Sequence, residues 1–124
     1  MCLYDLNNLK SVDVSDSYLR QVAVGMNISV ARIQIRKGST TQLHSHESEE
    51  IVIVLKGKWG FTLPTHEVIV SPNQMLLIPS QLEHSSLALE DTIAIEICTP
   101  ARGDWISRED GSLHNDPDQY LWAV

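Results

Sequence analysis

Apolar and polar residues alternate along short stretches of this 124-residue chain, and turn-forming residues separate the stretches. Alternation with a period of two is typical of β-strands, while glycine, proline and asparagine mark the turns between them. We predict nine to ten strands, at residues 12–15, 18–24, 28–36, 40–46, 50–55, 58–63, 67–70, 74–78, 82–89 and 92–99. Short strands at regular spacing favour an all-β sandwich or barrel.

The length of the chain favours one domain, because 124 residues fall within the usual size of a single core. Residues 1–19 are predicted to form a lead-in and an edge strand, residues 20–100 the barrel, and residues 101–124 a tail. Most of the tail is polar, and we expect a loop as far as a short helical turn that begins at Asp116 and ends at residues 120–122.

Two strands are apolar on both faces, at residues 51–54 and 93–95. A small barrel has one interior, so the outer face of such strands needs another cover. We expect a homodimer that packs sheet against sheet, with the tail packing on the barrel or on the partner subunit.

Composition narrows the choice of partners. Hydrophobic residues make up 43% of the chain but include only three Trp, three Tyr and one Phe, so Val, Ile and Leu must form most of the core. The formal net charge is -7, and nine Lys and Arg are spread thinly. Without a basic stripe to follow phosphates, nucleic-acid binding is not expected.

The chain also lacks the sequence signals of membranes and secretion. No apolar run approaches the roughly 20 residues that cross a bilayer, and the N-terminus is too polar for a signal peptide. Cys2 and Cys98 are too few and too differently placed for a disulfide framework, which indicates free thiols. We therefore expect a cytoplasmic protein without membrane partners.

The strongest chemical signal lies between Gly38 and Gly57, where His44 and His46 are followed by Glu50. Residues i and i+2 of a strand point to the same face, so the two imidazoles can converge on one ion. Glu50 opens the next strand and can return to that ion. The alternative is that both histidines are ordinary surface residues.

A fourth ligand must come from elsewhere in the chain. His66 lies in a turn and His114 in the polar tail, whereas His84 lies inside a predicted strand, so we favour His84. Imidazoles with one carboxylate suit one divalent transition metal, iron, manganese, nickel, cobalt or zinc, and do not suit calcium. Four protein ligands on an octahedral ion leave two positions for water, oxygen or a chelating substrate.

These residues carry a resemblance to the cupin superfamily. The pattern Gly38-x5-His44-x-His46-x3-Glu50-x6-Gly57 resembles the first cupin motif at every defining position. The second motif is matched in part: Asn73 replaces its first glycine, Pro79 and His84 match, Gln81 replaces its second glycine, and Ala88 replaces its asparagine. The resemblance covers residues 20–100 and implies an RmlC-like jelly-roll β-barrel, with His44, His46, Glu50 and His84 as metal ligands.

Residues 96–105 resemble the end of the barrel in small single-domain cupins of the KdgF-like pectin-degradation type, which open unsaturated uronates into linear keto acids. By this resemblance Glu96 matches a catalytic carboxylate and Arg102 an arginine at the site. Two positions differ: Cys98 replaces an aromatic residue, and Glu50 lies where that branch often has glutamine.

The residues themselves also give Glu96 a role. A glutamate inside an apolar strand is costly unless it faces a polar cavity or a partner, so Glu96 is a candidate general acid or base. The alternatives are ion pairs, of Glu96 with Arg32 or Arg36 and of Arg102 with Asp104.

Three function classes follow. The first is a metal-dependent enzyme on a small oxygenated substrate, a sugar acid or a keto or enol acid, acting as an isomerase, lyase or uronate-opening enzyme. The second is an iron-dependent dioxygenase. The third is a non-enzymatic binding or sensor cupin, which the absence of a helix-turn-helix pattern makes less favoured.

Overall fold

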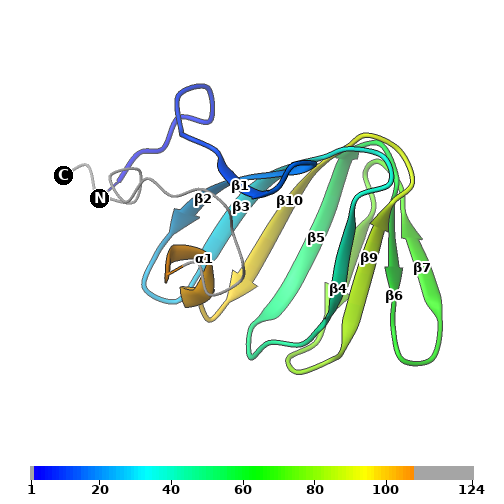
Figure 1. Ribbon diagram of the computed structural model, residues 1–124. Coiled ribbons are helices and arrows are strands. Elements are labelled where there is room, and N and C mark those ends of the chain that lie inside the picture. Colours follow the sequence, from blue (N-terminus) through cyan, green and yellow to red (C-terminus); the bar gives the residue numbers. More distant parts are fainter. Residues whose placement is uncertain (1, 108–124) are drawn as a thin grey trace.

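The computed structural model of the protein describes residues 2–107, which form ten β-strands and one short helix (Figure 1). In chain order the elements are β1 (Val12–Ser15), β2 (Tyr18–Val24), β3 (Ser29–Ile35), β4 (Thr40–His44), β5 (Glu49–Lys56), β6 (Trp59–Thr62), β7 (Glu67–Val70), β8 (Met75–Ile78), β9 (His84–Ala88), β10 (Thr92–Thr99) and α1 (Gly103–Ser107). The predicted all-β fold is confirmed.

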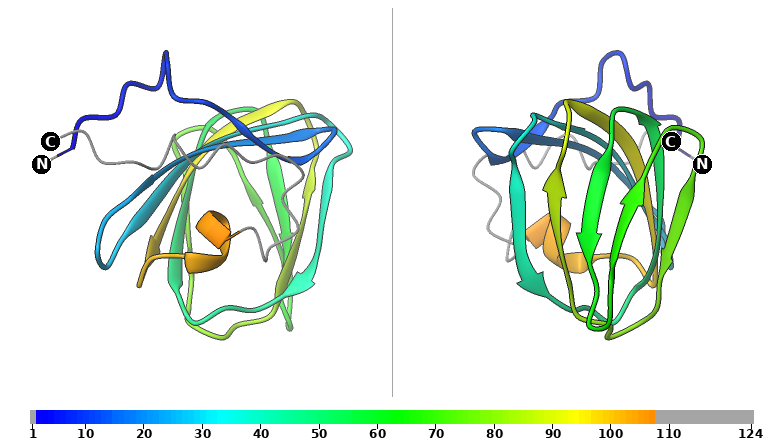
Figure 2. Two further views of the ribbon diagram at one scale, coloured as in Figure 1. Left: turned by 60° about the vertical axis from the view of Figure 1, so that its left-hand side comes forward. Right: turned by 90° about the vertical axis from the view of Figure 1, so that its right-hand side faces the viewer.

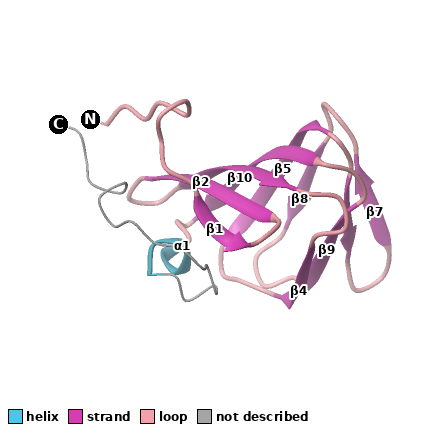
Figure 3. Ribbon diagram, turned by 45° about the horizontal axis from the view of Figure 1, so that its top comes forward, coloured by secondary structure: helices cyan, strands magenta, loops and turns pink. Residues whose placement is uncertain are grey.

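The strands form two antiparallel sheets that face each other (Figure 3). One sheet has six strands in the order β1-β2-β3-β10-β5-β8, and the other has four in the order β4-β9-β6-β7. Strands distant in sequence therefore become neighbours, as β10 does when it pairs with both β3 and β5. The two sheets enclose one interior, as in a jelly roll.

Alternate residues of the six-stranded sheet fill this interior. On β3 Ala31 and Ile33 are buried, and β5 contributes Val52 and Val54. The four-stranded sheet adds the rings of Trp59 and other large side chains from the opposite side. The buried residues of these strands therefore recur at every second position, as the alternation in the sequence predicts.

Two glycines of the first cupin-like motif occupy turns that other residues fit poorly. Gly38 has φ 88° and Gly57 has φ 90°, a region that L-residues other than glycine rarely adopt. A Cβ atom on Gly57 would lie 2.3 Å from the carbonyl oxygen of Asp91, so this turn has no room for a side chain.

The outer face of the six-stranded sheet is apolar over β5, β8 and β10. Leu55, Met75 and Leu77 are exposed there, next to half-buried Ile51 and Ile53. The homodimer remains a prediction, and this face is the surface on which it depends. Among the described residues, no helix is long and apolar enough to span a bilayer.

Two details differ from the sequence-based expectations. The strand predicted to end at residue 46 ends at His44, because its register shifts between Thr41 and His44, so His46 lies in the corner that follows. Residues 103–107 were expected to be irregular, yet they form α1, with Asp104 in the first turn, where a negative charge is favourable. The helical turn predicted at residues 116–122 lies outside the described residues.

Candidate functional site

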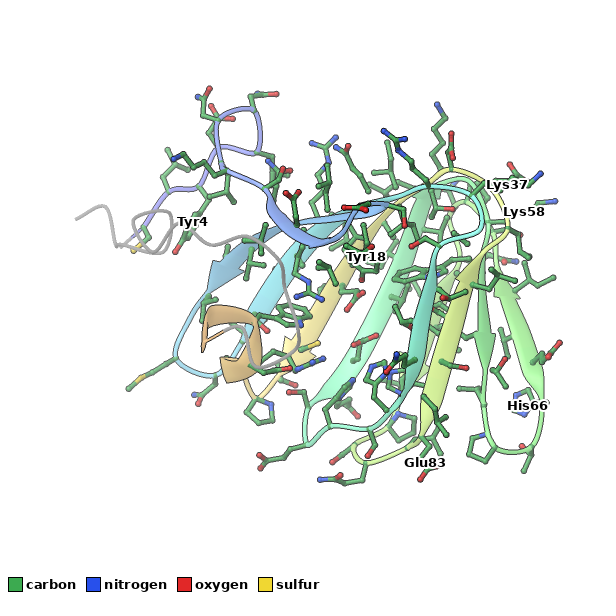
Figure 4. All side chains as sticks on the ribbon, viewed as in Figure 1. Tyr4, Tyr18, Lys37, Lys58, His66 and Glu83 are labelled. Carbon is green, nitrogen blue, oxygen red and sulfur yellow. The ribbon has the colours of Figure 1, made fainter. Side chains whose placement is uncertain are left out.

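Three histidines converge where β4 ends and β9 begins, and Figure 4 labels Glu83, the residue before His84. His44 at the end of β4 pairs with His84 at the start of β9, and their ring centroids are 4.3 Å apart. The ring of His46 lies 5.0 Å from that of His84. One ring nitrogen from each of the three lies within 4.8 Å of the others, so this group could hold a metal ion.

Backbone hydrogen bonds orient all three rings in the same way. Each Nδ1 lies 2.7 to 2.8 Å from a main-chain carbonyl oxygen, and these acceptors belong to Gln42, Ser48 and Leu82. A carbonyl can only accept, so each Nδ1 carries the proton and each Nε2 has a free lone pair in the neutral ring. Metal-binding histidines typically donate the N–H group of their other ring nitrogen to a carbonyl oxygen in this way.

The contact between His46 and Glu50 is the clearest test of whether a cation fits. The Nε2 atom of His46 is buried and has no hydrogen-bond partner among the described residues, and it lies 3.4 Å from Oε1 of Glu50. Two acceptor atoms this close repel each other unless a positive charge lies beside both. A divalent metal would supply that charge, so the residues present fit a metal ion.

Electrostatics keep the ligand atoms in the state that a metal requires. Burial alone would raise the pKa of Glu50, but the neighbouring imidazoles of His46 and His84 outweigh burial and lower it. Burial lowers the pKa of His84, which favours the neutral ring. A charged carboxylate and a neutral imidazole are the forms that bind metals.

The turn before His84 keeps its shape without the second glycine of the cupin motif. Gln81 has φ 65° at that position, and Asn73 has φ 67° at the position of the first glycine. The amide of Gln81 donates to the carbonyl oxygen of His46 at 2.8 Å, which ties the loop before β9 to the corner after β4. Gln81 therefore tolerates a left-handed conformation that costs a side chain about 1 kcal/mol.

Glu96 faces the interior and contacts neither Arg32 nor Arg36, so the predicted alternative of an ion pair with these two is not observed. It is buried on β10, and the hydroxyl of Tyr18 on β2 donates to its Oε1 atom at 3.1 Å. Burial raises the pKa of Glu96 to about 8, and the negative charge of Glu50 acts in the same direction. Near neutral pH this carboxyl group is largely protonated.

Sequence reasoning missed two residues next to these carboxyl groups. Cys98 lies 3.5 Å from Oε1 of Glu50, and burial raises the pKa of its thiol, so the thiol stays protonated and donates to the carboxylate. Tyr18 lies with Arg20 on the inner face of β2, and both line the cavity. The signal available in the sequence was a tyrosine and an arginine two positions apart on one face of a predicted strand.

Arg102 forms the ion pair with Asp104 that was the alternative to a role at the site, its Nε atom lying 2.7 Å from Oδ1. The guanidinium group of Arg102 also lies 5.1 Å from the ring centroid of Trp105, which is fully buried. These contacts fasten α1 at the open end between the two sheets, where Figure 2 shows it.

All six predicted site residues line one cavity of about 540 Å³ between the sheets. They are His44, His46, Glu50, His84, Glu96 and Arg102. His66 lies apart from them at the tip between β6 and β7 (Figure 4), and His114 lies outside the described residues. A cavity of this size is typical of small-molecule sites.

Known structures share this architecture. KdgF from Halomonas sp. aligns with a TM-score of 0.77 and 23% identity, covering 83% of this chain and 98% of that one. An RmlC-like cupin from Shewanella frigidimarina aligns with a TM-score of 0.79 and 17% identity, covering 84% and 95%. Ectoine synthase from P. lautus aligns with a TM-score of 0.77 and 17% identity, covering 100% and 99%.

These similarities concern the fold, which they identify as the RmlC-like jelly roll predicted from the sequence. No curated protein sequence matches the chain. The family model described as the Cupin domain matches residues 31–99, which include the three histidines and both buried glutamates. The chain therefore belongs to the cupin family.

Proposed function

We propose that the protein is a metal-dependent enzyme that moves a proton on a small oxygenated substrate, a sugar acid or a keto or enol acid. One observation carries this proposal: a buried, protonated carboxyl group on Glu96 lines the same cavity as three histidines with inward lone pairs. A site that only binds a ligand has no need of a carboxyl group whose pKa is raised to about 8.

The metal would be held by His44, His46, Glu50 and His84, and its identity stays open among iron, manganese, nickel, cobalt and zinc. When bound, it supplies a Lewis acid that polarises a carbonyl or enol oxygen. The carbonyl partners of the three Nδ1 atoms hold the rings in place, and the thiol of Cys98 holds the carboxylate of Glu50.

Glu96 would carry out the proton transfer. Its protonated carboxyl group can donate to a substrate carbon while it receives the proton of an enolic hydroxyl, which converts an enol into its keto form and leaves Glu96 unchanged. The hydroxyl of Tyr18 fixes one oxygen of this carboxyl group. Isomerases, lyases and enzymes that open unsaturated uronates all require such a step.

Two further similarities support an enzymatic role. The polyketide cyclase RemF from Streptomyces resistomycificus has the same fold, with a TM-score of 0.68 and 18% identity, as does the ectoine synthase already described.

Arg102 is proposed to act on the site through α1, because Asp104 already engages its guanidinium fork.

The test combines elemental analysis with a substrate screen. Purified protein, loaded with the metal that it retains, is assayed against unsaturated uronates, keto acids and phenolic diols. We expect turnover without oxygen consumption, and Glu96→Gln should retain the metal but lose turnover. Glu67→Gln changes an exposed glutamate on β7 and serves as the matched control.

Other outcomes identify the other classes. Oxygen uptake that depends on substrate would indicate a dioxygenase, and binding without any turnover would indicate a sensor. Full activity of Glu96→Gln would remove its role as proton carrier.

A further inference from the structure

Among the four residues proposed to hold the metal, His46 is the one that lies outside the strands. His44 ends β4, His84 begins β9 and Glu50 lies on β5, whereas His46 lies in the corner between β4 and β5. A strand is held by its ladder of hydrogen bonds, so a ligand on a strand is placed more precisely than a ligand on a loop. The position of His46 therefore depends on contacts that come from outside the corner.

Ser48 makes the contact that orients the ring of His46. Its main-chain carbonyl oxygen accepts the proton of Nδ1 of His46 at 2.8 Å, and this places Nε2 of the ring 3.4 Å from Oε1 of Glu50. The bond from the amide of Gln81 to the carbonyl oxygen of His46 holds only the backbone and does not set the rotation of the ring. The orientation of the imidazole is therefore as fixed as residue 48 itself.

The side chain of Ser48 joins the corner to a distant part of the chain. Its hydroxyl group donates to the carbonyl oxygen of Pro100 at 2.6 Å, across 52 positions of sequence. Ser48 is buried, with 3% of its surface exposed. Water does not compete for a buried hydrogen bond as it does at the surface, so this bond can hold the corner in place.

The segment that Ser48 contacts, residues 100–105, lies at the open end of the cavity (Figure 2). Every residue of this segment after the first lines the cavity. The amide of Arg102 donates to the hydroxyl oxygen of Ser29 on β3 at 3.1 Å. The ring of Trp105 packs between two guanidinium groups, 4.6 Å from that of Arg20 and 5.1 Å from that of Arg102. The segment is therefore anchored to the six-stranded sheet.

We propose that Ser48 is a positioning residue for the metal site, which orients His46 through its carbonyl group and fastens it to the segment 100–105 through its hydroxyl group. Binding of a metal by His46 should then also hold this segment at the open end of the cavity, because a coupling free energy acts equally in both directions. The inference takes only the metal ligands from the proposed function, and it applies to any reaction at this site.

Titration of Co²⁺ into the full chain, after a chelator has removed its metal, tests the positioning role. Calorimetry gives the affinity, and the visible absorption of Co²⁺ reports the number and geometry of its ligands. Ser48→Ala removes the hydroxyl group but keeps the carbonyl group, and it should weaken Co²⁺ binding by about 10-fold and change the spectrum. Ser48→Thr keeps the hydroxyl group and should restore both. An unchanged affinity and spectrum in Ser48→Ala would overturn the inference.

A double-mutant cycle shows whether Ser48 acts through His46. Ser48→Ala should weaken Co²⁺ binding by about 10-fold in the unmodified background and have no further effect in His46→Ala, which has no ring to orient. An equal loss in both backgrounds would contradict the positioning role.

Ser45→Ala is the matched control, because Ser45 is an exposed serine of the same corner. It should bind Co²⁺ like the unmodified protein, and a loss equal to that in Ser48→Ala would also overturn the inference. Thermal melting of the metal-free variants identifies any that fail to fold. The cycle between Ser48 and His46 does not depend on the folding of Ser48→Thr.

Hydrogen exchange tests the coupling from the side of the segment. The amide of Trp105 donates to the carbonyl oxygen of Arg102 at 3.2 Å, and the amide of Arg102 donates to Ser29. Saturating Co²⁺ should slow the exchange of these two amides by about 3-fold or more in the unmodified protein but not in Ser48→Ala. Mass spectrometry of peptides that cover residues 100–105 measures this. Exchange that does not respond to Co²⁺ in the unmodified protein would overturn the coupling.

The outcomes separate this inference from the proposed function. If the unmodified protein binds no Co²⁺, the inference fails together with the metal site. If it binds Co²⁺ and Ser48→Ala binds equally well, the inference alone fails, whatever turnover is found. If Ser48→Ala weakens binding through His46 but no substrate is turned over, the positioning role stands and the catalytic proposal fails.

Discussion

Tyr18 and Glu96 are 78 positions apart in sequence, yet the tyrosine hydroxyl donates to the Oε1 atom of the glutamate at 3.1 Å. The bond joins β2 to β10, although β3 lies between these strands in the sheet. Both side chains are buried on the inner face, and burial raises the pKa of each. They form a polar pair in the wall of the cavity.

Tyr18→Phe should slow turnover by about 3- to 10-fold, because the loss of one hydrogen bond leaves the carboxyl group of Glu96 less well oriented. Metal content should not change, since Tyr18 does not belong to the histidine group. Steady-state kinetics and elemental analysis provide the two measurements. Tyr4→Phe, which lies outside the cavity, is the control, and an equal loss of activity in both variants would contradict a role for the bond.

The stability of the metal-free protein should depend on pH through Glu96. The folded-state pKa is about 8, above the ordinary value of 4.5, so folding favours the protonated form. Its contribution is complete below pH 4.5 and is lost as pH rises toward 8, with a slope of up to about 1.4 kcal/mol per pH unit.

Urea unfolding of the protein after a chelator has removed its metal, between pH 4.5 and 8, measures this contribution. Glu96→Gln cannot ionise, so its free energy of unfolding should fall less steeply with rising pH than that of the unmodified protein. Parallel curves for the two proteins would show that Glu96 ionises normally in the folded state.

His44→Ala should remove most of the bound metal, because it leaves two imidazoles where three converge. Saturating metal should stabilise the unmodified protein by about 3 to 4 kcal/mol at 100 to 1,000 times its Kd, and the variant should lose this increase. Elemental analysis and thermal melting provide the measurements. His66→Ala removes an exposed histidine at the tip between β6 and β7, and it should keep both metal and stabilisation.

Gln81→Gly should stabilise the fold by about 0.5 to 1 kcal/mol, because glycine adopts φ 65° without the strain that a side chain incurs. The bond from this amide to the carbonyl oxygen of His46 uses only the backbone and should persist. Urea unfolding measures the change, and Gln81→Ala, which keeps a Cβ atom, should show no gain. Equal stability of both variants would mean that the turn stores no strain.

Local patterns in the sequence accounted for most of the strands and for the histidine group. Strand positions follow from alternation, and His44, His46 and Glu50 are close in sequence, so their convergence depends on one corner. The pair of Tyr18 with Glu96 could not be found in this way, because it depends on which strands become neighbours. A register shift within a strand, like that in β4, likewise cannot be predicted from the alternation of apolar and polar residues.

The same limit applies to α1. Five residues are too few for a helical period, and what stabilises α1 is the burial of Trp105 between Arg20 and Arg102, which come from distant parts of the chain. The sequence therefore indicated Arg102, whereas the stacking of Arg20 on the ring of Trp105 could be found only in the structure.

The apolar outer face of the six-stranded sheet should bind a second copy of the chain. Leu77→Asp places a charge on that face and should convert a dimer of twice 13.9 kDa into a monomer, as measured by light scattering. Ile69→Asp is a matched control, because Ile69 on β7 and Leu77 on β8 are each 55% exposed but lie on different sheets. A dimer that persists in Leu77→Asp but dissociates in Ile69→Asp would place the interface on the four-stranded sheet. A monomeric unmodified protein would show that the outer face of the six-stranded sheet remains uncovered by a second copy.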